Sequence, residues 1–106
     1  MPDKPDLTYT WEKLHIAVRG IAVDEGNLKT RLYNSYLAWM TLDPSDFPPD
    51  LAPRFAKLHQ SVTAITPYAD EGSLKATIDT FTDDYARHAI EEIVSLYDAV
   101  ARLIGP

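Results

Sequence analysis

Three histidines, with the carboxylates near them in the sequence, are the residues best suited to chemistry. Glu12 and His15 form a Glu-x-x-His pair, which a helix would place on one face. His88 and Glu92 are four residues apart and would share a face in the same way. Imidazole nitrogens and carboxylate oxygens bind divalent transition metals. The candidate metal ligands are Glu12, His15, His59, His88 and Glu92.

The sequence holds half of the pattern that a dinuclear metal site would need. Carboxylate-bridged di-iron bundles use two Glu-x-x-His pairs and two further carboxylates, and Ala56 stands where the second pair would need its glutamate. The chain also lacks cysteine, a Gly-rich phosphate loop and the HExxH motif of zinc proteases. We therefore favour a protein without cofactor or enzymatic activity, and keep a metal-binding helical-bundle enzyme as the alternative.

Four carboxylates lie in two short turns of similar sequence. Asp24 and Glu25 precede a Gly-Asn pair, and Asp70 and Glu71 precede a Gly-Ser pair. Such carboxylates could hold a calcium ion or receive a basic protein, but they lack the alternating spacing of a calcium-binding loop. The stronger interpretation is local. Each glycine would end a helix in the left-handed conformation, and the residue after it would cap the next helix.

The two turns belong to a sequence unit that the chain contains twice. Residues 11–32 align with residues 55–78, with Trp11 opposite Phe55 and a two-residue insertion before the second turn. The identical positions are Lys13/Lys57, Leu14/Leu58, His15/His59, Val18/Val62, Ile21/Ile65, Asp24/Asp70, Glu25/Glu71, Gly26/Gly72, Leu28/Leu74 and Lys29/Lys75. These identities favour a duplication, and each copy predicts a helix, a tight turn and a second helix.

Helical periodicity predicts two helices in the first half of the chain. Apolar residues recur at steps of three or four along residues 8–23 and again along residues 28–41. Thr8 or Thr10 would cap the first helix. Gly20 in its interior costs about 1 kcal/mol relative to alanine, so we expect a neighbouring helix to approach closely there.

A proline-rich joint at residues 43–50 separates the two halves. We expect one short turn at residues 44–47, with Phe47 anchored on the core. Asp50 would then cap a third helix that runs to about Thr66.

The last helix is predicted to be long, from Ser73 to Ile104, with a kink or break near Thr80–Thr82 because threonine is a weak helix former. The fold class is therefore all-α, an antiparallel up-down four-helix bundle built from two similar helical hairpins. We expect a single domain over residues 1–106, with a flexible arm at 1–7, a first hairpin at 8–41, the joint at 42–50 and a second hairpin at 51–104.

An uninterrupted last helix would extend beyond the other three at the joint end. The apolar residues on this overhang are Ile90, Ile93, Val94, Leu96, Tyr97, Val100, Leu103 and Ile104. Because large apolar surfaces are rarely left in water, we expect a homodimer through this helix.

Composition limits the classes of partner. The net charge of −6 disfavours nucleic acid, which is bound through lysine and arginine, and it suits a basic protein. No stretch approaches the roughly 20 apolar residues of a membrane span. The first residues contain no apolar run of signal-peptide length, and the chain has no cysteine, so we expect a cytoplasmic location.

These observations predict a small acidic helical module for protein–protein interaction that self-associates. An adaptor, a regulator and an antitoxin-like protein all fit this description. The candidate interaction surface comprises Ile90, Val94, Tyr97 and Ile104 on the last helix, and Asp24, Glu25, Asp70 and Glu71 in the two turns.

Overall fold

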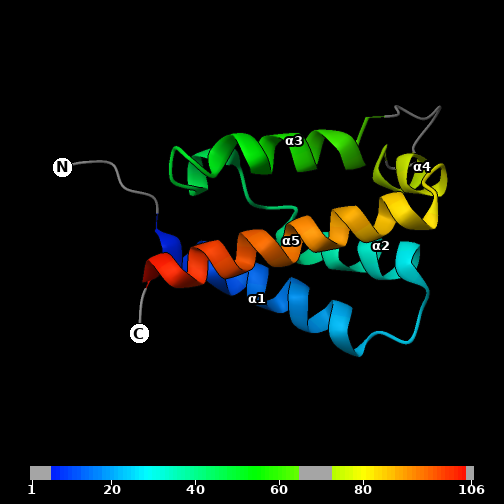
Figure 1. Ribbon diagram of the computed structural model, residues 1–106, viewed down its shortest axis with the longest axis horizontal. Helices are drawn as coiled ribbons and strands as arrows, with labels where there is room; N and C mark the ends of the chain where they lie inside the picture. Colours follow the sequence, from blue (N-terminus) through cyan, green and yellow to red (C-terminus); the bar gives the residue numbers. More distant parts are fainter. Residues whose placement is uncertain (1–5, 65–72, 105–106) are drawn as a thin grey trace.

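The computed structural model describes residues 6–64 and 73–104, and every regular element within these ranges is a helix. In chain order they are α1 (Leu7–Val23), α2 (Leu28–Trp39), the short 3-10 helix η1 (Pro44–Asp46), α3 (Ala52–Val62), α4 (Ser73–Asp79) and α5 (Asp83–Ile104). Successive long helices α1, α2, α3 and α5 run in opposite directions (Figure 1). The predicted all-α antiparallel bundle is confirmed.

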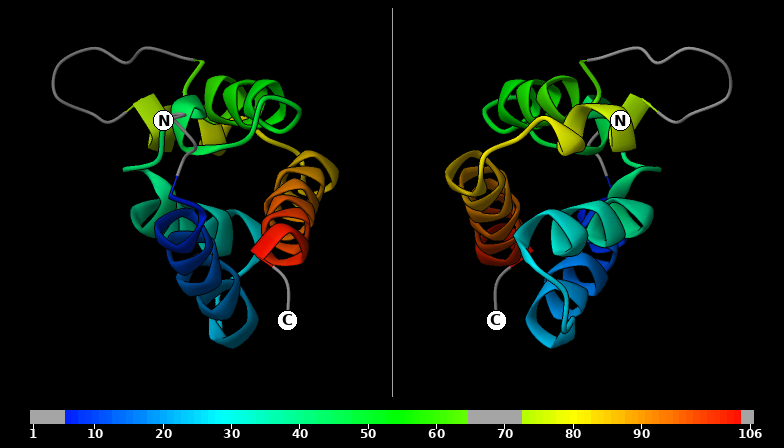
Figure 2. Two further views of the ribbon diagram at one scale, coloured as in Figure 1. Left: turned by 90° about the vertical axis from the view of Figure 1, so that its left-hand side faces the viewer. Right: turned by 90° about the vertical axis from the view of Figure 1, so that its right-hand side faces the viewer.

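One hydrophobic core joins the helices. Seen end-on, α1, α2, α3 and α5 surround it (Figure 2). Leu14, Trp39, Phe55 and Ile93, one from each long helix, are almost completely buried. Each such side chain contributes about 1.5–3 kcal/mol relative to an exposed position. The periodic apolar positions therefore supply the main force that assembles the bundle.

The first helix begins at Leu7, before both predicted caps. Asp6 is the N-cap, and its carboxylate accepts hydrogen bonds from the backbone N–H groups of Thr8 and Tyr9 at 3.1 and 3.4 Å. The prediction of Thr8 or Thr10 as the cap is therefore wrong. Thr10 is instead buried, and its hydroxyl donates to the carbonyl of Asp46 at 2.8 Å, which ties α1 to η1. Residues 1–5 of the predicted arm lie outside the described residues.

The turn between α1 and α2 matches its predicted position but not its predicted backbone. Asn27 caps α2 by accepting from the N–H of Thr30 at 2.9 Å, as predicted. Gly26 does not adopt the left-handed conformation expected of it. A Cβ atom there would lie 2.7 Å from Cγ2 of Thr30. Glycine is therefore needed in this turn because a larger side chain would clash with Thr30.

Gly20 contradicts a second expectation. A Cβ atom built on it would have no heavy atom within 4 Å, apart from its own helix backbone and chain neighbours, so no neighbouring helix approaches it closely.

The second helix ends at Trp39, two residues earlier than predicted.

The proline-rich joint contains the predicted turn, η1, and the predicted anchor. Phe47 is 3% exposed and stacks on Phe55 with ring centroids 4.6 Å apart. The predicted Asp50 cap is wrong, because Leu51 is the N-cap of α3 and makes no side-chain capping bond. The helix then ends at Val62 rather than near Thr66, since the backbone of Thr63 leaves the helical conformation.

The last predicted helix is two helices. The break lies at residues 80–82, where the sequence predicted a kink or break. Thr82 accepts a hydrogen bond from the N–H of Tyr85 at 3.1 Å and so starts α5. With 22 residues α5 is about 33 Å long. Among the described helices, none combines the length and the apolar character that crossing a bilayer requires.

The predicted apolar overhang of the last helix is wrong. Because the chain restarts at Thr82, α5 lies beside α1 (Figures 1 and 2), and Ile93, Leu96 and Val100 are fully buried within one chain. Val94, Leu103 and Ile104 remain 41–55% exposed. A single copy therefore covers most of the apolar surface from which a dimer through this helix was predicted.

Candidate functional site

His15 is held between aromatic rings where α1 meets α5. Its ring stacks on Trp11 with centroids 4.7 Å apart and an angle of 15° between the planes. Its Nδ1 atom lies 3.2 Å from the hydroxyl of Tyr97 on α5. Trp11 and Tyr97 also meet each other, with centroids 6.1 Å apart. We call these three residues the first aromatic–histidine cluster.

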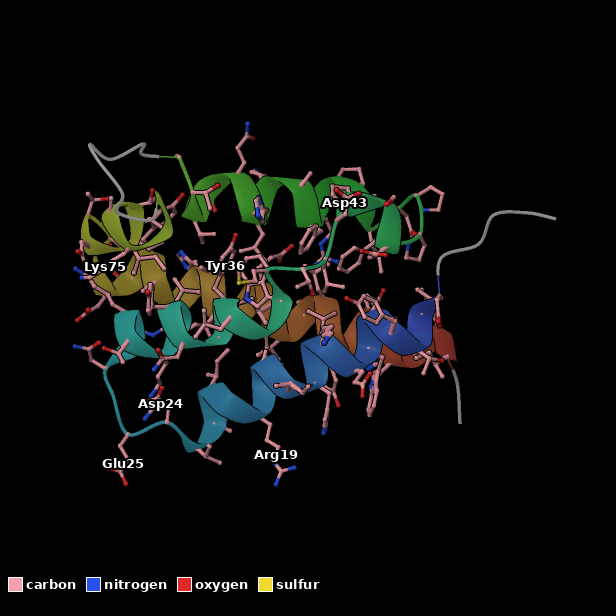
Figure 3. The ribbon with its side chains drawn as sticks, turned by 180° about the vertical axis from the view of Figure 1, so that it is seen from behind. Arg19, Asp24, Glu25, Tyr36, Asp43 and Lys75 are labelled. Atoms are coloured by element: carbon pink, nitrogen blue, oxygen red, sulfur yellow. The ribbon has the colours of Figure 1, made fainter. Side chains whose placement is uncertain are left out.

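His59 has a similar environment where α3 meets α2. Its Nε2 atom lies 3.0 Å from the hydroxyl of Tyr36, and the rings of Phe55 and Trp39 each lie 6.1 Å from its own. Figure 3 shows Tyr36 between α2 and α3. Burial raises the pKa of Tyr36, so its hydroxyl stays protonated at neutral pH and can donate to the imidazole. Phe55, His59 and Tyr36 form the second aromatic–histidine cluster.

The two clusters correspond to each other through the predicted repeat. His15 and His59 are aligned positions, and so are Trp11 and Phe55. Each histidine contacts the aromatic ring four residues before it and a tyrosine hydroxyl from the other half of the chain. The two aligned histidines thus share a pattern of contacts, while the duplication itself stays a prediction.

The third histidine lies in a groove between α3 and α5. His88 is exposed, and Glu92 on the next turn is held by Arg54. The Nε and Nη2 atoms of Arg54 lie 2.9 and 3.1 Å from the two carboxylate oxygens of Glu92, and Nη2 also donates to Ser95 at 2.9 Å. The hydrogen bonds to Glu92 raise the pKa of Arg54. The groove has a volume of about 340 Å³ and is lined by Arg54, Lys57, Leu58, Ser61, Tyr85, His88, Ala89 and Glu92.

The structure does not bring the five predicted metal ligands together. His15 and His59 belong to different clusters, while His88 and Glu92 line the α3–α5 groove. Glu12 is exposed on α1. Within residues 6–64 and 73–104, no three histidine, aspartate or glutamate side chains form a group that could hold a metal ion.

The acidic turn after α1 is held by its own hydrogen bonds. One carboxylate oxygen of Asp24 accepts from the N–H of Gly26 at 2.6 Å, and the other accepts from the side chain of Asn34 at 3.0 Å. The bond from Asn34, followed by that from Gly26, lowers the pKa of Asp24. Glu25 is exposed and extends from the same end of the molecule (Figure 3). Asp70 and Glu71 lie outside the described residues.

The predicted surface on α5 is partly occupied by the chain itself. Ile90 and Tyr97 are half-buried and pack against the core, and Tyr97 belongs to the first aromatic–histidine cluster. Val94 and Ile104 remain 41% and 44% exposed. This surface is therefore smaller than the sequence indicated.

A second apolar surface, which the sequence analysis missed, lies on the outside of α1 and α2. Its exposed side chains are Tyr9, Ile16 and Val23 of α1, Leu37 of α2, and Met40 at the C-cap of α2, with exposures between 38% and 72%. We call these five residues the α1–α2 face. The seven-residue spacing of Tyr9, Ile16 and Val23 was visible in the sequence, but the more hydrophobic stripe on the core side of the same helix masked it.

A hollow of about 350 Å³ lies within the α1–α2 face. Gly20 and Ala38 line it together with Ile16 and Leu37. The hydrogen bond between Asn34 and Asp24 spans the two helices at one end of this hollow. The α1–α2 face thus combines protruding apolar side chains with a recess beside them.

One buried polar atom could not be foreseen from the sequence. Trp39 is fully buried, and its indole N–H has no hydrogen-bond partner, which is true of no other buried side-chain nitrogen or oxygen in the described part of the chain. The rings of Tyr36 and Phe55 meet it edge-on at 4.7 and 5.7 Å. Since an unpaired buried N–H lowers stability, apolar packing must hold this ring in place.

Comparisons of this chain with protein-family models, with curated proteins and with solved structures gave no match.

Proposed function

We propose that this chain is a small acidic helical module for protein–protein interaction, acting as an adaptor, a regulator or an antitoxin-like protein. The observation that carries the proposal is the α1–α2 face. Ile16, Val23 and Leu37 are 49%, 72% and 60% exposed on two adjacent helices, with a hollow between them. Clustered apolar exposure beside a recess is typical of surfaces that bind other proteins.

Charge is distributed unevenly over the molecule, so a charged partner would favour one side over the other. Helices α1 and α2 contain four basic residues and one acidic residue, whereas α5 contains five acidic residues and two basic ones. A strongly basic partner would be steered towards α5, whereas the α1–α2 face, which has more basic than acidic residues beside it, suits a partner that brings negative charge.

The contacts of His15 and His59 pack helices together, so the proposed function does not rest on these residues. His15 and His59 are each packed against aromatic rings and a tyrosine hydroxyl. His88 and Glu92 line the α3–α5 groove, and Glu92 is paired with Arg54. The contact of His15 with Tyr97 joins α1 to α5, that of His59 with Tyr36 joins α3 to α2, and the ion pair joins α3 to α5.

Affinity capture from a lysate of the source organism tests the proposal. Wild type is compared with a double variant, Ile16→Lys/Leu37→Lys, which places two charges on the α1–α2 face. Leu103→Lys is the matched control, because Leu103 is similarly exposed but lies on α5. We expect wild type and the control to retain one protein in stoichiometric amount, and the double variant to lose it. Equal capture by all three proteins, or none by wild type, would reject the proposal.

A further inference from the structure

We infer that the outer side of α1 pairs with the same helix of a second copy of this chain, antiparallel, about a two-fold axis beside Ile16. This inference rests on the proposed function and names one partner for the α1–α2 face. A two-fold dimer needs a surface that complements itself, with apolar residues meeting apolar residues and opposite charges meeting each other.

The apolar residues on the outside of α1 are arranged symmetrically about Ile16. Tyr9 lies seven residues before it and Val23 seven residues after it, so the three share one side of the helix. All three are exposed, at 38%, 49% and 72%. In an antiparallel pair centred on Ile16, each Tyr9 lies opposite the second copy's Val23, and the two Ile16 side chains meet at the axis.

The charges beside this stripe complement each other in the same arrangement. Glu12 and Arg19 lie seven residues apart on one flank of the stripe, and both are exposed. No hydrogen bond or ion pair joins either side chain to another described residue, and Figure 3 shows Arg19 pointing away from the molecule. A two-fold axis brings equal flanks together, so Glu12 of each copy comes level with Arg19 of the other.

Gly20 gives a third argument, from the other flank of the stripe. A glycine inside a helix lowers its stability, and the space around Gly20 shows that packing within one chain does not require it. Gly20 instead lines the hollow beside Ile16 and Leu37. A residue without a side chain at this point lets a second helix come close, and the hollow can receive apolar side chains of that helix.

The outer side of α1 suits self-association better than α5, through which the sequence predicted a dimer. Two copies joined through α5 would bring its five acidic residues together against two basic ones, and like charges across an interface are unfavourable. On α5, Tyr97 and Ile90 are also half-buried within one chain. The outer side of α1 carries both signs of charge and is open.

Sedimentation equilibrium over a wide range of protein concentration tests the inference by charge reversal. We expect wild type to dimerise reversibly. Arg19→Glu and Glu12→Arg should each raise the dissociation constant by about tenfold or more, since each creates two like-charged pairs per dimer. The double variant Glu12→Arg/Arg19→Glu should return the constant to within about threefold of wild type, because the pairs are restored with their signs exchanged.

A second pair of variants separates association from folding. Gly20→Leu fills the hollow and should abolish the dimer while the melting temperature of the monomer stays the same or rises. Ala22→Leu is the control, since two residues turn the helix by about 200° and place the same bulk on the opposite side. It should dimerise as wild type does.

Three results would overturn the inference: a wild type that stays monomeric throughout, a double charge variant that fails to recover, or a Gly20→Leu variant that dimerises normally. The lysate capture distinguishes these from failure of the proposed function. A monomeric wild type that still captures a partner through Ile16 and Leu37 would reject the second copy and retain the binding role.

Discussion

The two aromatic–histidine clusters share one pattern of contacts but differ in how deeply they are buried. In both, a histidine contacts an aromatic ring four residues earlier and a tyrosine hydroxyl from the other half of the chain. Phe55 is 1% exposed and touches Trp39, whereas Trp11 is half-buried at the edge of α1 and α5. The difference arises because Trp39 of α2 and Phe47 of the joint pack against Phe55 in the second cluster. Similar sequence units therefore supply a core in one place and its border in another.

Truncation of the aligned aromatic residues is the strongest test of this difference. Phe55→Ala should lower the free energy of unfolding by about 3–5 kcal/mol, because it empties a fully enclosed site beside Phe47 and Trp39. Trp11→Ala should cost about 1–2 kcal/mol, since that ring is only partly buried and lies at the border of the core. Urea unfolding followed by circular dichroism measures both. Phe55→Leu is the control for volume, and equal losses at the two positions would contradict the comparison.

Removing the tyrosine hydroxyls sharpens the comparison at the level of one hydrogen bond. Tyr36→Phe should lower the free energy of unfolding by about 1–2 kcal/mol, because it leaves a half-buried nitrogen of His59 unpaired. Tyr97→Phe should cost about 0.5–1 kcal/mol, since its contact to His15 is longer, at 3.2 Å. The same urea experiment applies.

A double-mutant cycle with His59→Ala isolates the hydrogen bond in the second cluster. The coupling between Tyr36→Phe and His59→Ala should account for most of the Tyr36→Phe loss. A coupling near zero would show that the two side chains are merely adjacent.

The secondary structure was predictable because its signals are local. The apolar period on residues 8–23, the cap at Asn27 and the helix restart at Thr82 each depend on a few neighbouring residues, and the structure contains all three. A prediction of this kind is wrong where two nearby residues could both serve as the helix cap and tertiary contacts decide between them. Thr10 has a capping side chain, but its burial against Asp46 removes it from that role, and Asp6 caps the helix instead.

The candidate surfaces were less predictable, because they depend on how helices lie against one another. Whether Ile93 or Ile16 meets water is decided by the direction α5 takes after the break at residues 80–82. The pairing of His15 with Tyr97 joins positions 82 residues apart, and no periodicity along the chain encodes it. The correspondence of the two clusters could have been anticipated only for the histidine and its preceding aromatic ring.

The two glycines of the first half should respond to alanine in opposite directions. Gly26→Ala should lower the free energy of unfolding by about 1 kcal/mol or more, because the new Cβ would lie 2.7 Å from Thr30 and 3.0 Å from Asp24. Gly20→Ala should raise it by about 0.5–1 kcal/mol, since its surroundings are open and alanine favours the helix. Thermal unfolding of dilute protein, where only the monomer is present, measures both. A loss of stability for Gly20→Ala would mean that this helix is under a constraint that its contacts do not explain.

The smallest expected effect is the response to acid of two carboxylates, one in the turn after α1 and one in the joint. Hydrogen bonds from Asn34 and Gly26 lower the pKa of Asp24 below 3.8, and bonds from the N–H and hydroxyl of Ser45 do the same for Asp43. A carboxyl group with a lowered folded-state pKa stabilises the fold fully above its unfolded pKa and loses this contribution as the pH falls through the folded value.

Asp24→Asn and Asp43→Asn should therefore each flatten the fall in stability as the pH drops below about 5, while at neutral pH each variant should be slightly less stable than wild type. Both effects should be small, because these carboxylates are largely solvated and solvent screens their charge. Urea midpoints measured across this pH range supply the test. If Asp24 acts only by closing its turn through hydrogen bonds, and not through its charge, Asp24→Asn will shift the curve down without changing its slope.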